Sequence, residues 1–145
     1  MANEFTAGDR ANLVRQFIET MPFAKALQMK MEEMADGTAV ISMPYSPEIV
    51  GDPATGVIHG GAVSALMDTC GGAAVMCHPR TKAATATLDL RIDYMRPATP
   101  GDRITARAHC YNVTRSVAFV RAEAFDGDAS RPVASATGAF TMAGG

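Results

Sequence analysis

The chain has 145 residues, of which 19% are charged, and its formal net charge at pH 7 is -2. A chain of this length typically forms one domain, here expected over residues 1–145, and can bury roughly two thirds of its surface without a metal or disulfide. The balanced charge lacks the basic patch that nucleic acid or a membrane surface attracts, so neither partner is expected.

Cysteine usage predicts a reducing compartment. Cys70, Cys77 and Cys110 form no CxxC pair, and an odd number without framework spacing is typical of reduced thiols. The first residues lack the basic and apolar segments of a signal peptide. The apolar segment after His59 is interrupted by Asp68 and is too polar at its ends to span a bilayer. We therefore expect a cytoplasmic globular protein.

The first expected element is an amphipathic helix over residues 9–20. Leu13, Phe17 and Ile18 recur there at helical spacing, which indicates one apolar face. Met21-Pro22 follows and is expected to end the helix. The sequence thus predicts an extra N-terminal helix ahead of a core over about residues 23–142.

A hairpin and a loop are expected next. Residues 28–34 and 38–44 flank Asp36-Gly37, a dipeptide typical of tight turns between strands. Residues 46–58 contain two prolines and two glycines, which favours an irregular loop.

A long apolar helix is expected over residues 60–77. Gly71 and Gly72 lie inside it, and each costs on the order of 1 kcal/mol relative to Ala. Close packing against a sheet would compensate for this cost. The later strands supply a face of small residues on which such a helix can lie, namely Ala106, Ala108, Ala118, Ala122, Ala124, Ala134, Ala136 and Gly138.

The clearest strand covers residues 84–95, where apolar and polar residues alternate strictly. The apolar face consists of Ala84, Ala86, Leu88, Leu90, Ile92 and Tyr94, and the polar face of Thr85, Thr87, Asp89, Arg91 and Asp93. Strands over 104–113, 117–125 and 133–142 complete an antiparallel meander. The expected fold is α+β, with one central helix wrapped by a sheet of five to six antiparallel strands.

The segment His59-Gly60-Gly61 is the clearest candidate for a functional site. Backbone N–H groups at a helix start are unpaired and carry partial positive charge, and glycine lets a ligand approach them. Such a turn can polarise a carbonyl oxygen. Asp68 lies two turns further along an apolar segment, where an unused charge is costly. The pattern predicts an oxyanion hole and a carboxylate that acts as general base or nucleophile.

These residues resemble a known family. The loop over residues 56–61, Asp68 nine residues after His59, and the strand end over residues 88–97 are similar to the PaaI-like acyl-CoA thioesterases of the hotdog superfamily. The resemblance extends over about residues 23–142. It implies a hotdog fold and hydrolysis of an acyl-CoA thioester without a metal or prosthetic group, coenzyme A being part of the substrate. No metal-ligand spacing is present in the sequence.

The resemblance also implies roles for single residues. The Gly60 amide polarises the thioester carbonyl with Gly61 beside it, and Asp68 activates water or attacks the carbonyl directly. Thr87 falls where family members place a hydroxyl that positions the water. Asp52 stands where many members carry an Asn, and an ionised carboxylate cannot donate a hydrogen bond to the substrate.

Three other side chains are further candidates for the site. His59 either transfers a proton or fixes the loop by hydrogen bonding. Arg91 and Arg96 are candidates for the coenzyme A phosphates, because guanidinium binds phosphate well. Alternatively, Arg91 pairs with Asp89 or Asp93 on its own face of the strand.

The proposed donor and base cannot meet within one chain. A helix rises about 1.5 Å per residue, so Gly60 and Asp68 lie roughly 12 Å apart, whereas both must reach one carbonyl at about 3 Å. Two such helices packed antiparallel about a two-fold axis would join them. Small residues share one stripe with Asp68: Gly61, Ser64, Ala65 and Gly72. We therefore expect an obligate homodimer with composite sites, and tetramers are also common in the family.

Two other functions remain open. A hotdog-fold enoyl-CoA hydratase or dehydratase would use an acid and a histidine, for which Asp52 and His59 are the candidates. A non-catalytic acyl-CoA binding protein would bind the same ligand without turnover.

Overall fold

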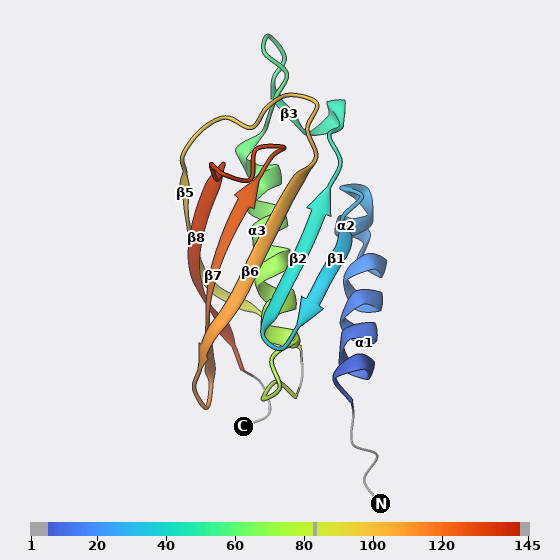
Figure 1. Cartoon of the computed structure of the whole chain (residues 1–145), viewed down its shortest axis with the longest axis vertical. Helices are drawn as coiled ribbons and strands as arrows, with labels where there is room; N and C mark the ends of the chain where they lie inside the picture. Colours follow the sequence, from blue (N-terminus) through green and yellow to red (C-terminus); the bar gives the residue numbers. More distant parts are fainter. Residues whose placement is uncertain (1–5, 83, 143–145) are drawn as a thin grey trace, which may run out of the picture.

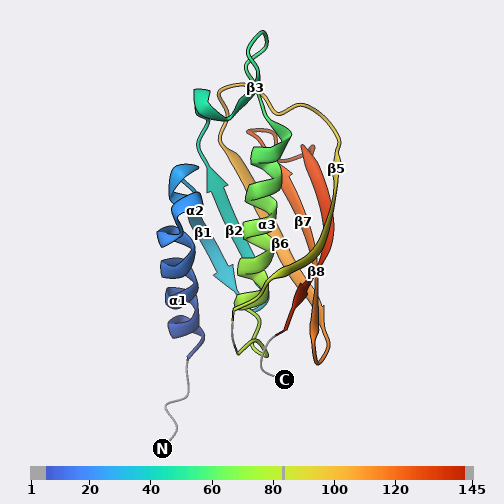
Figure 2. The ribbon, with the colours of Figure 1, turned by 180° about the vertical axis from the view of Figure 1, so that it is seen from behind.

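The computed structural model describes residues 6–82 and 84–142. Its large antiparallel sheet has the strand order β1-β2-β6-β7-β8-β5 (Figure 1). These strands are β1 (Lys30–Ala35), β2 (Thr38–Met43), β5 (Thr87–Tyr94), β6 (Ile104–Val113), β7 (Val117–Phe125) and β8 (Ala134–Thr141). Helix α3 (Gly60–Met76) lies across one face of the sheet, and Figure 2 shows α1 (Ala7–Thr20) beside it on that face. The expected α+β hotdog arrangement is confirmed, with six strands in this sheet.

Two segments differ from expectation. Pro22 ends the first helix, as expected, but it also begins a second one, α2 (Pro22–Ala26), because proline is favoured in the first turn of a helix. The segment 46–58, expected to be a loop, contains a 3-10 turn (Pro47–Ile49) and a small ladder of β3 (Val50–Asp52) with β4 (Val57–Ile58). Within the part of the chain that the structure describes, no helix is long and apolar enough to cross a membrane.

Helix α1 buries a narrower face than its sequence indicates. Val14 and Ile18 are buried, whereas Leu13 and Phe17 are 51% and 46% exposed. The helix packs against the edge strand β1 and against α3, so one stripe of side chains is covered. The expectation that Leu13 and Phe17 belong to the buried face is therefore wrong.

Helix α3 lies close to the sheet because the facing side chains are small. The expected alanines are all at most 4% exposed, namely Ala106, Ala108, Ala118, Ala122, Ala124, Ala134 and Ala136. A Cβ on Gly71 would lie 2.8 Å from Cζ of Phe140, so glycine is needed at this contact. A Cβ on Gly72 would meet nothing closer than 3.8 Å, so close packing explains Gly71 and leaves Gly72 unexplained.

Strand β5 contains a β-bulge that breaks the strict alternation expected for this segment. Thr87 pairs with Phe140 but Asp89 pairs with Ala139, so Leu88 is an extra residue in the strand. Because side chains alternate between the faces of a sheet, the extra residue moves Thr87 from the polar face to the face of the buried Phe140. The Asp89 carboxylate accepts a hydrogen bond from the Ala139 N–H at 3.0 Å and so satisfies a donor beside the bulge.

An ion pair between Arg96 and Asp126 holds the segment that follows β5. Both terminal nitrogens of Arg96 donate to the Asp126 carboxylate, at 2.7 and 2.8 Å. The N–H and hydroxyl of Thr99 also donate to Asp126, each at 3.0 Å, and the Asp126 side chain has no exposed surface. These bonds, those from Arg96 above all, hold the pKa of Asp126 well below its usual range.

Replacing Asp126 by Asn should destabilise the fold in a pH-dependent way. Because the pKa of Asp126 is lowered by folding, its ion pair stabilises the protein above about pH 4, and this stabilisation is lost as the pH falls. We expect Asp126→Asn to lower the free energy of unfolding at pH 7 by about 3 kcal/mol, and to flatten its decline below about pH 4. Urea denaturation across pH measures both effects.

The matched control is Asp128→Asn, which removes an exposed carboxylate paired with Arg131. Exposed pairs contribute little, so the control should change stability far less than Asp126→Asn. Equal losses in the two variants would contradict the role given to the Arg96–Asp126 pair.

Candidate active site

The start of α3 leaves one backbone donor free. His59 is the N-cap residue, and its Nδ1 accepts a hydrogen bond from the Gly61 N–H at 2.7 Å. The Ala62 N–H donates to the His59 carbonyl at 3.0 Å. No residue among 6–82 and 84–142 accepts from the Gly60 N–H. Gly60 therefore offers a free N–H where the helix dipole is positive, while Nδ1 of His59 is occupied as an acceptor.

Asp68 is held by the strand that contains the bulge. The Thr87 hydroxyl donates to Oδ1 of Asp68 at 2.6 Å, so the re-aimed Thr87 side chain fixes one carboxylate oxygen. Asp68 is half-buried in a surface hollow of about 410 Å³. The hollow is lined by Gly61, Ser64, Ala65, Asp68, Leu90 and Ile92. The hollow therefore joins the less buried stripe of α3 to strand β5 and leaves space beside the carboxylate.

Tyr94 is a site residue that the sequence reasoning missed. Its hydroxyl donates to the Gly60 carbonyl at 3.0 Å and also contacts the Ser64 hydroxyl. Tyr94 and Gly60 together line a second, mainly apolar hollow of about 430 Å³, which Val63 and Met95 also line. Tyr94 belongs to the strand end that carries the resemblance, but the alternation assigns it only to an apolar face.

The Asp52 carboxylate is hydrogen-bonded to residues of its own turn. One carboxylate oxygen accepts from the Ala54 N–H at 3.0 Å and the other from the Thr55 hydroxyl at 2.8 Å. These bonds, the one from Thr55 first, lower the pKa of the exposed Asp52 carboxyl. Its described partners therefore lie at the tip of the β3–β4 ladder, and the Asp52–His59 pair that a hydratase would need is not formed.

Arg96 and Arg91, the two candidate ligands for the coenzyme A phosphates, differ in how many guanidinium donors are already bound. Both terminal nitrogens of Arg96 are bound to Asp126, Pro97 and Arg131, and its Nε is buried, so the expected contact with coenzyme A would require breaking the ion pair. Arg96 therefore acts within the ion pair in this structure, and its expected contact with coenzyme A stays a prediction. Arg91 is exposed and lies 3.4 Å from Asp93, so it keeps donors for an anion.

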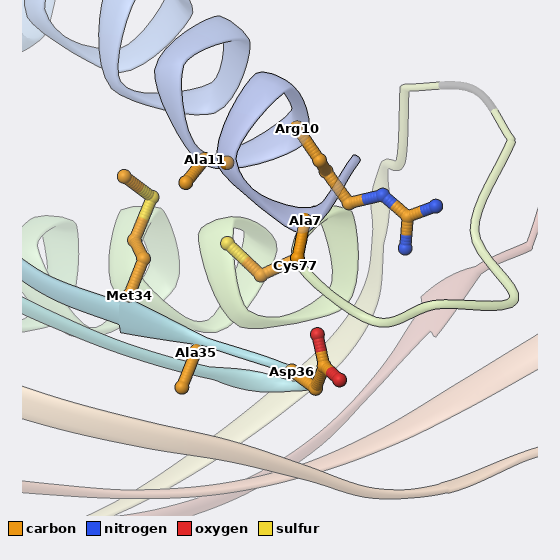
Figure 3. A pocket seen from close by; sticks show the side chains of 8 residues that line it. Ala7, Arg10, Ala11, Met34, Ala35, Asp36 and Cys77 are labelled. Atoms are coloured by element: carbon orange, nitrogen blue, oxygen red, sulfur yellow. The ribbon is translucent and has the colours of Figure 1, made fainter. Parts of the chain in front are cut away.

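A hollow of about 240 Å³ near the C-terminal end of α3 is lined in part by the thiol of Cys77 (Figure 3). Arg10 and Asp36 lie around it, and Arg10 donates to the His78 carbonyl at 2.8 Å. Burial raises the pKa of the Cys77 thiol to about 11 and that of Cys70 to about 12, so both stay protonated. Across the described ranges, no group of three or more His, Cys, Asp or Glu side chains is placed to hold a metal ion.

Comparison with known proteins defines the class. A family model described as the thioesterase superfamily matches residues 55–133, more than half of the chain. The medium/long-chain acyl-CoA thioesterase YigI of Escherichia coli is 29% identical, over 98% of this chain and 99% of its own. A Pseudomonas aeruginosa protein of known structure is 37% identical, with a TM-score of 0.81, over 91% of this chain and 98% of that one.

A structure of a mutant of the phenylacetic acid degradation protein PaaI from Thermus thermophilus is 31% identical, with a TM-score of 0.73. The match covers 83% of this chain and 98% of that one. The fold is thus that of a PaaI-like hotdog thioesterase. The chain belongs to the thioesterase superfamily, and it is an enzyme of that superfamily.

The Thr87 hydroxyl should matter for turnover. Thr87→Val keeps the side-chain shape but removes the donor to Asp68, so the carboxylate loses its orientation. We expect kcat for thioester hydrolysis to fall about tenfold, the size of one hydrogen bond to a charged group, while Thr87→Ser retains most activity. Steady-state thiol release measures kcat, and thermal melting checks the fold. Equal kcat values for the Val and Ser variants would contradict this role.

Proposed function

We propose that the protein hydrolyses acyl-CoA thioesters to the free acid and coenzyme A at composite sites of a homodimer. The observation that carries the proposal is the Asp68 carboxylate, fixed by Thr87 in a hollow on the less buried stripe of α3, together with the free Gly60 N–H at the start of the same helix. The E. coli relative is named for medium- and long-chain acyl-CoA, so these substrates are tested first.

The chemistry needs one donor and one carboxylate. The Gly60 N–H binds the thioester oxygen as negative charge develops there. Asp68 takes a proton from water, whose oxygen attacks the carbonyl carbon, or it attacks the carbon itself to form an anhydride that water then cleaves. The C–S bond breaks in either route, and coenzyme A leaves as a thiolate that is protonated. Arg91, which keeps donors for an anion, is the first candidate for the coenzyme A phosphates.

The dimer is supported by geometry. Gly60 and Asp68 lie roughly 12 Å apart along α3, too far to act on one carbonyl within a chain. Strand β5 ends the sheet, and nothing described pairs with its outer edge. Leu88 on it is 57% exposed, and an open sheet edge favours pairing with a second copy. A two-fold axis beside β5 would place the α3 stripes of two chains together, and two dimers could form a tetramer.

The first test is thiol release from a panel of acyl-CoAs by the wild type and by Asp68→Asn. We expect turnover by the wild type and a drop of at least about a hundredfold in the variant. Glu33→Gln, which alters an exposed acid of strand β1, is the control and should keep the wild-type rate. The protein's own thiols are buried, so they will not consume the thiol reagent. Tight binding of acyl-CoA without turnover would instead favour a binding protein.

Complementation tests the composite site. Gly60→Pro removes the N–H, and proline is tolerated at the first helical position, whereas Gly60→Ala adds a Cβ but keeps the N–H. A random mixture of the strongly impaired Asp68→Asn and Gly60→Pro chains forms half mixed dimers, each with one intact site. We therefore expect about a quarter of the wild-type activity. No recovery in dimers shown to have mixed would place the site within one chain.

The three reduced, buried cysteines support a cytoplasmic location, and we propose that no cofactor is needed beyond the coenzyme A of the substrate.

A further inference from the structure

We propose that Tyr94 is a positioning residue: its hydroxyl and the His59 imidazole hold the Gly60–Gly61 peptide at both ends and so direct the Gly60 N–H. The Gly60 carbonyl accepts from Tyr94 at 3.0 Å and from the Ser64 hydroxyl at 3.2 Å. The Gly61 N–H, at the other end of the same planar unit, donates to His59 at 2.7 Å. One peptide is thus bound by side chains from a strand and from the N-cap.

The two glycines make room for the two rings. A Cβ on Gly60 would lie 3.3 Å from Cε1 of Tyr94, closer than usual for such a contact. A Cβ on Gly61 would lie 2.8 Å from Nδ1 of His59, which is too close. Each ring therefore packs on the glycine whose peptide it binds, and glycine at both positions is explained by these contacts.

Holding this peptide matters because glycine is the most flexible residue in the chain and helix ends fray. The Gly60 N–H belongs to the preceding peptide, and only the two backbone dihedrals of Gly60 connect that peptide to the held one. The preceding peptide begins at His59, whose N–H donates to the Ile49 carbonyl at 2.7 Å. With both neighbours fixed, the Gly60 N–H keeps one direction, as a donor to a developing oxyanion must.

Tyr94 is itself well anchored for this task. It pairs with Ala134 of β8, and the next N–H, of Met95, donates to the Val133 carbonyl at 2.8 Å. Arg96 follows and is bound to Asp126. The phenol therefore projects from a strand end that is fixed by the sheet and by a buried ion pair.

This inference rests on the proposed function, since it gives Tyr94 a role through the Gly60 donor. Tyr94→Phe keeps the ring on Gly60 and removes only the hydroxyl. We expect kcat to fall about tenfold with KM within about twofold, because the donor acts on charge that develops in the transition state. Tyr111→Phe, which removes the hydroxyl of another partly exposed tyrosine, should leave both constants unchanged.

Two readouts separate positioning from a structural role. In a Gly60→Pro background, where the donor is gone, Tyr94→Phe should cause no further loss of kcat, because Tyr94 acts through that donor. Amide hydrogen exchange of Gly61, followed by NMR, should be faster in Tyr94→Phe than in the wild type and in Tyr111→Phe. The inference is overturned if the two losses of activity add, or if Gly61 exchange is unchanged. If the wild type hydrolysed no acyl-CoA, the proposed function would fail. Gly61 exchange alone would then decide whether Tyr94 holds the Gly60–Gly61 peptide.

Discussion

Helix α3 lies on a sheet face built largely of alanine, with Phe140 filling the space that Gly71 leaves open. Because most of the side chains between them are small, the helix lies close to the sheet and most of its circumference is buried. The less buried stripe carries Gly61, Ser64 and Asp68, so its polar groups are those that a ligand can approach. The position of the candidate site thus follows from how closely the helix and the sheet pack.

Strand β5 contacts helix α3 near both of the strand's ends. At its beginning, the bulge at Leu88 turns Thr87 toward Asp68. At its end, the strand places Tyr94 against the first turn of α3. One strand therefore supplies a hydroxyl that binds Asp68 and another that binds the Gly60 carbonyl, next to the proposed Gly60 donor. A change in the register of β5 would displace both together.

Much of this arrangement is predictable from the sequence, where local patterns decide the structure. The strands over 104–113 and 117–125 match β6 and β7, because both alternate and are bounded by turns. The row of alanines and the helix start at Gly60 are also read correctly. In each case the information lies within a few neighbouring residues.

The features that the sequence does not disclose depend on distant partners. The residues of β5 alternate strictly between apolar and polar types in the sequence. The bulge arises from pairing with β8, where a Cβ on Gly138 would lie 2.7 Å from the Asp89 carbonyl. The sequence suggests Arg96 as a phosphate ligand, and the structure adds its ion pair with Asp126, thirty residues away. Tyr94 likewise reaches Gly60 across the fold. Local periodicity carries no record of such contacts.

The free donor at the start of α3 belongs to the main chain, so substitutions act on it differently from a side-chain donor. A side-chain donor can be lost through many codon changes, whereas the Gly60 N–H survives replacement by any residue except proline. Its direction, however, is set by neighbouring rings that ordinary mutations do alter. Natural variation would therefore retain the donor and retune its surroundings, so that activity drifts gradually as the rings around it change.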